Sequence, residues 1–405
     1  MNVQERTAVI LAPERNAGER PLSRKKELDV VSVVMAVMVV VIHISSEAVT
    51  KLPAPSLSHI AVFVPWRLFM CAVQGFILVS GIKFAAGFRR RELRYGAYLC
   101  SRLKKIILPY AVCNVLYYVY FVGDGYFPFK ISALVRYIFN GELVAPFYFV
   151  LIIMQFYLLA PLWLRLLKKA PAAPLLAVSL IVTVLWDTAL PEILRAAAPS
   201  MNLIPWSRVF FGNLIYWMVG CCIGARYEDA MRQLRADTRR LTLLTFLTAA
   251  IFLPYSYLLS VYGGGLRYGF VLRAVQNLLF MLLCLCGVPL LLRVCAGIAV
   301  KYETLCAGRV FSCVAASTYY IYLIHCLFIQ LTDKLLARLD VTRIRDRFCI
   351  RLIAVCALSV VSASLLTAAE EKIRTQIKKN RKDRKCGKET KQDAGAEPDT
   401  ERTHD

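Results

Sequence analysis

A long apolar run near the start of the chain constrains the fold more than any other feature. It begins after a basic residue at Lys25 and continues from Asp29 almost without interruption to Glu47. A run of this length and composition is typical of a helix that spans a membrane. One histidine, His43, lies inside it, and an ionisable side chain within a spanning helix indicates a functional site. We therefore expect the other helices to surround and orient this histidine.

The composition of the whole chain is that of a polytopic membrane protein. Hydrophobic residues make up 58% of the 405 residues, which is too large a share for a soluble protein of this length. The formal net charge of +23 falls mainly in short loops between apolar runs. It therefore indicates membrane orientation and contact with anionic lipids rather than nucleic-acid binding. Most of the 14 cysteines lie in apolar runs, and no CxxC pair accompanies a histidine cluster, so we predict neither disulfides nor a metal site.

The apolar runs predict an all-α fold, a transmembrane bundle of about ten spanning helices. The expected helices are 29–47, 67–86, 106–122, 147–167, 175–190, 206–225, 241–261, 269–292, 311–331 and 348–368. A loop that contains Pro53, Pro55 and His59 is expected between the first two. Residues 1–24 form a cytoplasmic tail without the apolar stretch of a cleavable signal, residues 25–370 form the membrane domain, and residues 371–405 form a basic and then acidic tail that we expect to be disordered.

The basic loops predict how the bundle is oriented. Lys and Arg cluster before the first helix and in the even-numbered connections, and the odd-numbered connections carry fewer of them, with 334–347 as an exception. The positive-inside rule then places both termini in the cytoplasm. His43 lies 14 residues after Asp29, which corresponds to about 21 Å of helix. We therefore expect it beyond the midplane, toward the outer face.

Glu47 follows His43 by four residues, so both side chains should lie on one helix face and come within reach of each other. A carboxylate beside an imidazole fixes its tautomer and raises its basicity. That arrangement suits a general base which takes a proton from a hydroxyl group. The alternative is a histidine that only makes hydrogen bonds inside the bundle.

Further charged residues lie in or beside the predicted spans. We expect His325, Arg208 and Arg273 in the outer halves of their helices, where they either contact substrate or join helices. Arg102 and Lys105 precede the third helix on the cytoplasmic side. They are candidates to hold the phosphates of a nucleotide-containing donor, although orientation and lipid binding would also explain them. The chain has no Walker loop, GxSxG or HExxH motif, so pumps, soluble-type serine hydrolases and zincins are not supported.

Several segments in this order resemble the acyltransferase-3 family of integral-membrane acyltransferases, which modify cell-surface glycans. They are LDVVSVVMAVMVVVIHIS, GFILVSGIKF, RLKKIILPY, FYFVLIIMQFYLLAPL and STYYIYLIHCLFI, and the resemblance spans roughly residues 25–370. It implies that the essential first-helix histidine is His43 and that the basic residue before the third helix is Arg102. It also implies an acyl-CoA donor, with acetyl-CoA favoured, and no bound cofactor. The implied acceptor is a hydroxyl of a cell-surface glycan or its lipid-linked precursor, handled at the outer side of a bacterial plasma membrane.

The chain departs from the family pattern at Ser32, where the family usually has an arginine, and at Pro146, where a histidine is common. Either another cation such as Lys83 or Arg102 replaces the arginine, or the chemistry is altered or lost. The segment 147–162 also resembles the branch assigned to export or succinylation of biofilm poly-N-acetylglucosamine. A polysaccharide exporter or flippase of the same fold is therefore the alternative function, and a structural membrane partner is a third.

Overall fold

Helices make up all the regular structure in the part of the chain that the computed structural model describes, which is residues 25–89, 91–190, 193, 197, 206–263 and 269–393. The predicted all-α class is therefore confirmed. The predicted tail at residues 1–24 lies outside the described residues. The helices are α2 (Lys26–Lys51), α3 (Leu57–Phe69), α4 (Ala72–Phe88), α5 (Tyr95–Arg102), α6 (Leu108–Gly123), α7 (Ile131–Asn140), α8 (Tyr148–Leu158), α9 (Ala160–Lys169), α10 (Ala172–Thr188), α12 (Leu214–Ala225), α13 (Tyr227–Ala236), α14 (Thr238–Tyr262), α15 (Gly269–Lys301), α16 (Glu303–Ala307), α17 (Arg309–Arg338) and α18 (Ile344–Asp393).

Seven of the described helices or helix pairs are long and apolar enough to cross a membrane, and the chain is an integral membrane protein. An eighth span is possible where α7 and the helix that begins at Ala145 form a pair bent by 56°. Two shorter apolar helices, Ala172–Thr188 and Phe210–Ala225, lie at the positions expected for the fifth and sixth spans. These segments correspond to the ten that the sequence suggests, but the count of ten spans itself stays a prediction.

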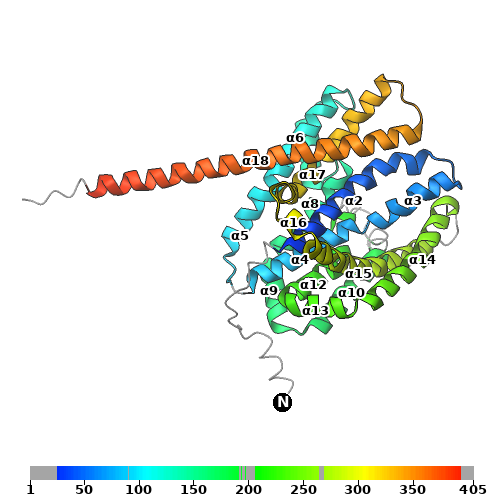
Figure 1. Ribbon diagram of the computed structural model, residues 1–405, viewed down its shortest axis with the longest axis horizontal. Coiled ribbons are helices and arrows are strands. Elements are labelled where there is room, and N and C mark those ends of the chain that lie inside the picture. Colours follow the sequence, from blue (N-terminus) through cyan, green and yellow to red (C-terminus); the bar gives the residue numbers. More distant parts are fainter. Residues whose placement is uncertain are drawn as a thin grey trace, which may run out of the picture.

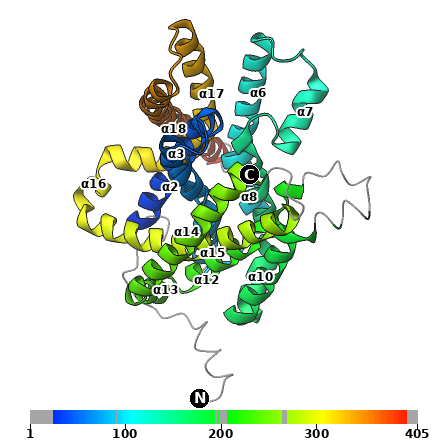
Figure 2. The same ribbon diagram turned by 90° about the vertical axis from the view of Figure 1, so that its right-hand side faces the viewer.

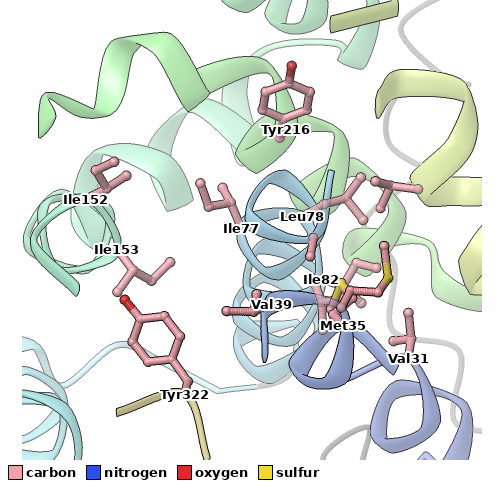
Figure 3. Packing of buried hydrophobic residues seen from close by; sticks show 14 of the residues in the cluster. Val31, Met35, Val39, Ile77, Leu78, Ile82, Ile152, Ile153, Tyr216 and Tyr322 are labelled. Atoms are coloured by element: carbon pink, nitrogen blue, oxygen red, sulfur yellow. The ribbon is translucent and has the colours of Figure 1, made fainter. Parts of the chain in front are cut away.

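The helix α2 lies in the middle of the bundle, packed by α3, α4, α15, α17 and α18 (Figure 1). Its apolar side chains, among them Val31, Met35 and Val39, are buried against residues of α4 such as Ile77 and Ile82 (Figure 3). A polar helix could not take this position, because burying unpaired polar groups costs free energy. The apolar segment near the start of the chain is thus the central helix of the fold.

The helices α4 and α12 approach each other closely because glycines line their crossing. Gly220 and Gly224 are four residues apart on α12, the GxxxG spacing that brings membrane helices together. A β-carbon at Gly220 would collide with the backbone carbonyl of Leu78, and one at Gly224 with that of Ile82. Gly81 on α4 faces the backbone of Trp217 in the same way. The crossing therefore fixes α4, and through it the central helix α2.

Two stretches differ from the sequence-based expectation. His59, expected in a loop, lies in α3, whose first turn is capped by Ser56: its hydroxyl accepts a hydrogen bond from the His59 amide at 3.1 Å. The tail after residue 370, expected to be disordered, continues α18 as a helix to Asp393 and extends beyond the bundle (Figure 1). Ion pairs at helical spacing, such as Arg374 with Glu370, favour this continuation. Residues 394–405 lie outside the described residues.

Contacts between helix ends show which loops share one end of the bundle. The His59 ring joins the Val49 carbonyl of α2, at 3.0 Å, to the Tyr257 hydroxyl of α14, at 3.2 Å. Tyr255 in turn donates to the Leu272 carbonyl near the start of α15, at 2.9 Å. We call this the Lys51 end of the bundle.

Figure 2 shows α7 folded back beside α6, where the Tyr110 hydroxyl donates to the Ile138 carbonyl at 2.8 Å.

Candidate functional site

The two membrane histidines meet at the centre of the bundle. His43 on α2 and His325 on α17 have ring centroids 5.2 Å apart, with the planes inclined by 42°. His325 is completely buried, whereas His43 is partly exposed. The sequence predicts comparable depths for the two residues, and the structure brings them into contact.

The hydrogen bonds of His325 define which ring nitrogen is free. Its Nδ1 lies 2.8 Å from the carbonyl oxygen of Tyr322 and 3.2 Å from that of Ile321. Carbonyl oxygens only accept hydrogen bonds, so Nδ1 carries the proton and Nε2 presents a lone pair. The Sγ of Cys326 lies 3.4 Å from this Nε2, at the distance of a thiol that donates to it. The two backbone carbonyls therefore fix the orientation and the tautomer of the His325 ring.

The ring of His43 makes no hydrogen bond within the described residues, so its nitrogens are free to meet a ligand. One atom each of His43, His325 and Cys326 lies within 4.8 Å of the other two. We call these three residues the His–His–Cys cluster. Sequence reasoning missed the contribution of Cys326, because its partner on α2 is far away in the sequence, although the cysteine follows a candidate histidine directly.

Glu47 has other partners than the one expected. Its carboxylate forms ion pairs with Arg351, with Arg347 at 3.5 Å and with Lys51 at 2.7 Å. Asp333 on α17 pairs with the same two arginines of α18. Arg351 is only 4% exposed, so the carboxylates compensate a buried guanidinium. The network joins α2, α17 and α18 one turn beyond the His–His–Cys cluster, and no hydrogen bond between Glu47 and His43 is among the described contacts.

A cation lies beside Ser32, the position where the family resemblance would place an arginine. The Nζ of Lys83 on α4 is 3.4 Å from the Ser32 hydroxyl, which itself donates to the Leu28 carbonyl at 2.6 Å. Lys83 also interacts electrostatically with Asp29, one turn before Ser32. These residues lie near the Lys26 end of α2, about 16 Å of helical rise from His43.

Arg102 lies in an aromatic setting at the same end of the bundle. Its guanidinium lies 5.0 Å from the ring centre of Tyr98 and 4.7 Å from that of Tyr157, a cation–π arrangement on two faces. Its buried Nε has no hydrogen-bond partner in the described part of the chain. Lys105 lies one turn further on, exposed in the π-helical segment Leu103–Ile107.

Two adjoining cavities extend from the Lys51 end of the bundle into its interior. The first, of about 410 Å³, contains Arg208, which forms an ion pair with Glu142 at 2.9 Å. The second, of about 380 Å³, contains Arg273. The cavities share polar wall residues, namely Asp187, Ser207, Asn213 and Asn277. Neither is lined by His43 or His325, so the structure separates the two predicted arginines from the histidine pair.

Aromatic residues complete both cavities. Tyr148, Tyr216 and Phe280 line the first, and Trp186, Trp206 and Phe270 line the second. Aromatic faces beside amide, carboxylate and guanidinium groups can hold a ligand that has both apolar faces and many hydroxyls. The predicted site residues thus form three groups: the histidine pair, Arg102 and Lys105 at the Lys26 end, and Arg208 and Arg273 in the two cavities.

Comparisons with known proteins identify the family but no individual relative. Residues 25–368 match the family described as acyltransferase domain, of the acyltransferase-3 type. Comparisons with curated proteins and with solved structures give no match. The family match covers the central helix, both histidines and all three groups of site residues. This chain is therefore a member of the acyltransferase-3 family of membrane acyltransferases.

Proposed function

We propose that the protein moves an acyl group, with acetyl favoured, from cytoplasmic acyl-CoA to a hydroxyl of a cell-surface glycan or its lipid-linked precursor. The proposed setting is a bacterial plasma membrane with both termini in the cytoplasm, which makes the Lys26 end cytoplasmic and the Lys51 end outer. The observation that carries the proposal is the contact between His43, which has free ring nitrogens, and a fixed His325 in a chain of this family.

His43 is the proposed general base. It takes the proton of the acceptor hydroxyl as the oxygen attacks the thioester carbonyl, and it then returns that proton to the departing CoA thiolate. His325 cannot take a proton at Nδ1, because that nitrogen already donates to two carbonyls. Its role is to hold His43 and the substrate in place. Glu47 supports the base from a distance, because its ion pairs with α18 fix the part of α2 that carries His43.

Arg102 is the proposed donor contact. A guanidinium between two tyrosine rings is held in place, and its unpartnered Nε still has a proton to donate to a phosphate oxygen. Lys105 adds positive charge at the same surface. Both residues lie at the end where a cytoplasmic nucleotide would arrive.

The two outer cavities are the proposed acceptor region. A sugar ring packs its C–H face on an aromatic side chain and donates its hydroxyls to carboxylate and amide groups, and these residue types line the cavities. Arg208 and Arg273 suit a glycan that carries an anionic group, such as the phosphate of a lipid-linked precursor. Membrane lipids are the remaining partners.

The test uses tag-free protein in lipid vesicles with radiolabelled acetyl-CoA and extracted surface glycan. We expect label in the glycan with wild-type protein and none with His43→Ala. The matched control is His59→Gln, which retains a donor and an acceptor for Val49 and Tyr257 and should transfer normally. Transfer that persists in His43→Ala contradicts the mechanism. If a deletion strain loses the glycan itself, rather than its acyl groups, export becomes the better explanation.

A further inference from the structure

We propose that the His–His–Cys cluster binds a thiophilic divalent cation, with Zn²⁺ as the best match, in the middle of the bundle. Its three ligand atoms lie within 4.8 Å of one another, and the residues belong to two different helices. Two imidazole nitrogens and one thiolate form the donor set that Zn²⁺ prefers, whereas Mg²⁺ and Ca²⁺ require oxygen ligands. The sequence alone predicts no metal site, because these residues converge only in the folded bundle.

The spacing of the two ligands on α17 already suits a tetrahedral ion. Zinc–sulfur and zinc–nitrogen bonds of about 2.3 and 2.0–2.1 Å place a sulfur and a nitrogen about 3.6 Å apart at the tetrahedral angle. The Sγ of Cys326 lies 3.4 Å from the Nε2 of His325. This edge of the site therefore needs almost no movement. The ring of His43 makes no hydrogen bond in the described structure and can rotate to supply the third ligand.

The surroundings fix His325 in the tautomer that a metal ion requires. Its Nδ1–H donates to backbone carbonyls, so the lone pair of Nε2 points away from them toward Cys326. A hydrogen bond from the other ring nitrogen is the usual support of a metal-bound histidine. Cys326 is only 8% exposed and His325 not at all, so water does not compete for these ligands. Binding displaces the thiol proton to solvent, because the thiolate is the ligand.

Metal binding would also regulate the acyl transfer, and this second step rests on the proposed function. A His43 nitrogen that ligates Zn²⁺ has no lone pair left to accept the proton of the acceptor. An occupied site and an active base therefore exclude each other. Zn²⁺ should inhibit transfer without competing with acyl-CoA at Arg102, which lies on α5 at the Lys26 end of the bundle and is not part of the cluster.

The experiment is a metal titration of full-length, tag-free, reduced protein in detergent, because an affinity tag of histidines would itself bind zinc. The chain has only four histidines but 14 cysteines, so the control variant has to measure binding by thiols outside the cluster. Zn²⁺ binding is followed by calorimetry, and Co²⁺ serves as the spectroscopic probe because a thiolate ligand gives an intense near-ultraviolet charge-transfer band. We expect one ion per chain, and we expect Cys326→Ser to lose the band and to bind Zn²⁺ at least about tenfold more weakly.

Cys313→Ser is the matched control, since this cysteine lies on the same helix but outside the cluster. It should bind both ions as the wild type does. His43→Ala and His325→Ala should weaken binding like Cys326→Ser, with thermal unfolding as the check that each variant is folded. Binding that is equal in wild type and Cys326→Ser, or a Co²⁺ complex without the band, overturns the proposal. These measurements involve no acyl-CoA, so they stand even where no transfer is found.

Discussion

The ammonium nitrogen of Lys83 on α4 lies 3.4 Å from the hydroxyl of Ser32 on α2. Ser32 is one of the two positions at which the family resemblance leads us to expect another residue, in this case an arginine. Positive charge is thus present at this position, but it reaches α2 from the neighbouring helix. Asp29, one turn earlier, interacts electrostatically with the same ammonium group. We infer that the lysine and serine together replace the family's arginine.

Removing this charge should slow transfer without unfolding the protein. We expect Lys83→Met to lower kcat/KM by about 10- to 100-fold, or about 1.4–2.8 kcal/mol in transition-state stabilisation, because a positioned cation is lost. Introducing Ser32→Arg into Lys83→Met should restore part of the rate, since the new guanidinium extends into the space of the missing ammonium. Steady-state kinetics of the two variants provide the check. Full activity in Lys83→Met would show that the cation is dispensable.

The two ends of the bundle should affect two different substrates. We expect Arg102→Met to raise the KM for acyl-CoA by about tenfold while the KM for the acceptor stays constant. Arg273→Met should do the reverse, because Arg273 lines the cavity at the opposite end. Arg273 has no ion pair among the described residues, so its loss should leave stability unchanged. Initial-rate kinetics with each substrate varied in turn distinguish the outcomes, and a rise in the same KM for both variants would refute the division.

The sequence predicts those features that depend on local pattern. Apolar runs of spanning length yield the all-α membrane fold, and counting residues along two helices yields the similar depths of His43 and His325. The pattern within one helix does not show which residue of another helix a side chain will contact. Glu47 is expected to reach His43 from one turn further along α2, yet the ion pair that it forms is with Arg351, which is contributed by α18. The Cys326 contact has the same origin: helical spacing shows a neighbour on α17 but says nothing of α2.

The local sequence pattern also fails to predict short helices and the residues at which they begin and end. Pro53 and Pro55 suggest a loop, but Ser56 caps a helix directly after them and brings His59 into α3. Gly220 reads as a weak helix former in isolation, and its value appears only when α4 lies against it.

The ion-pair network around Arg351 should stabilise the Lys51 end of the bundle. Arg351→Met removes the buried partner that Glu47 and Asp333 share, while Arg347 still pairs with both carboxylates. The expected cost is therefore below the roughly 3–5 kcal/mol that is typical when one member of an isolated buried pair is removed. We expect a clear fall in the apparent Tm in detergent. Glu47→Gln should cost less, because Asp333 still compensates Arg351.

A double variant, Glu47→Gln with Arg351→Met, shows whether the two residues act through each other. We expect the loss of stability in the double variant to be smaller than the sum of the single losses, with a coupling of about 0.5–3 kcal/mol. Additive losses would mean that Glu47 is not held by Arg351. If Glu47→Gln retains its Tm but loses transfer, direct assistance of His43 by the carboxylate becomes the better account of Glu47.

The glycine crossing between α4 and α12 should tolerate no larger residue. In Gly220→Ala the new methyl group would collide with the backbone carbonyl of Leu78, which cannot rotate away as a side chain would. The helices must then separate, and we expect a loss of about 1–3 kcal/mol of stability. Gly87→Ala is the matched control on α4, because a β-carbon there has no neighbour within 4 Å. Thermal unfolding of both variants in detergent provides the comparison: a lowered Tm for Gly220→Ala beside an unchanged or raised one for Gly87→Ala supports the close crossing, and equal values contradict it.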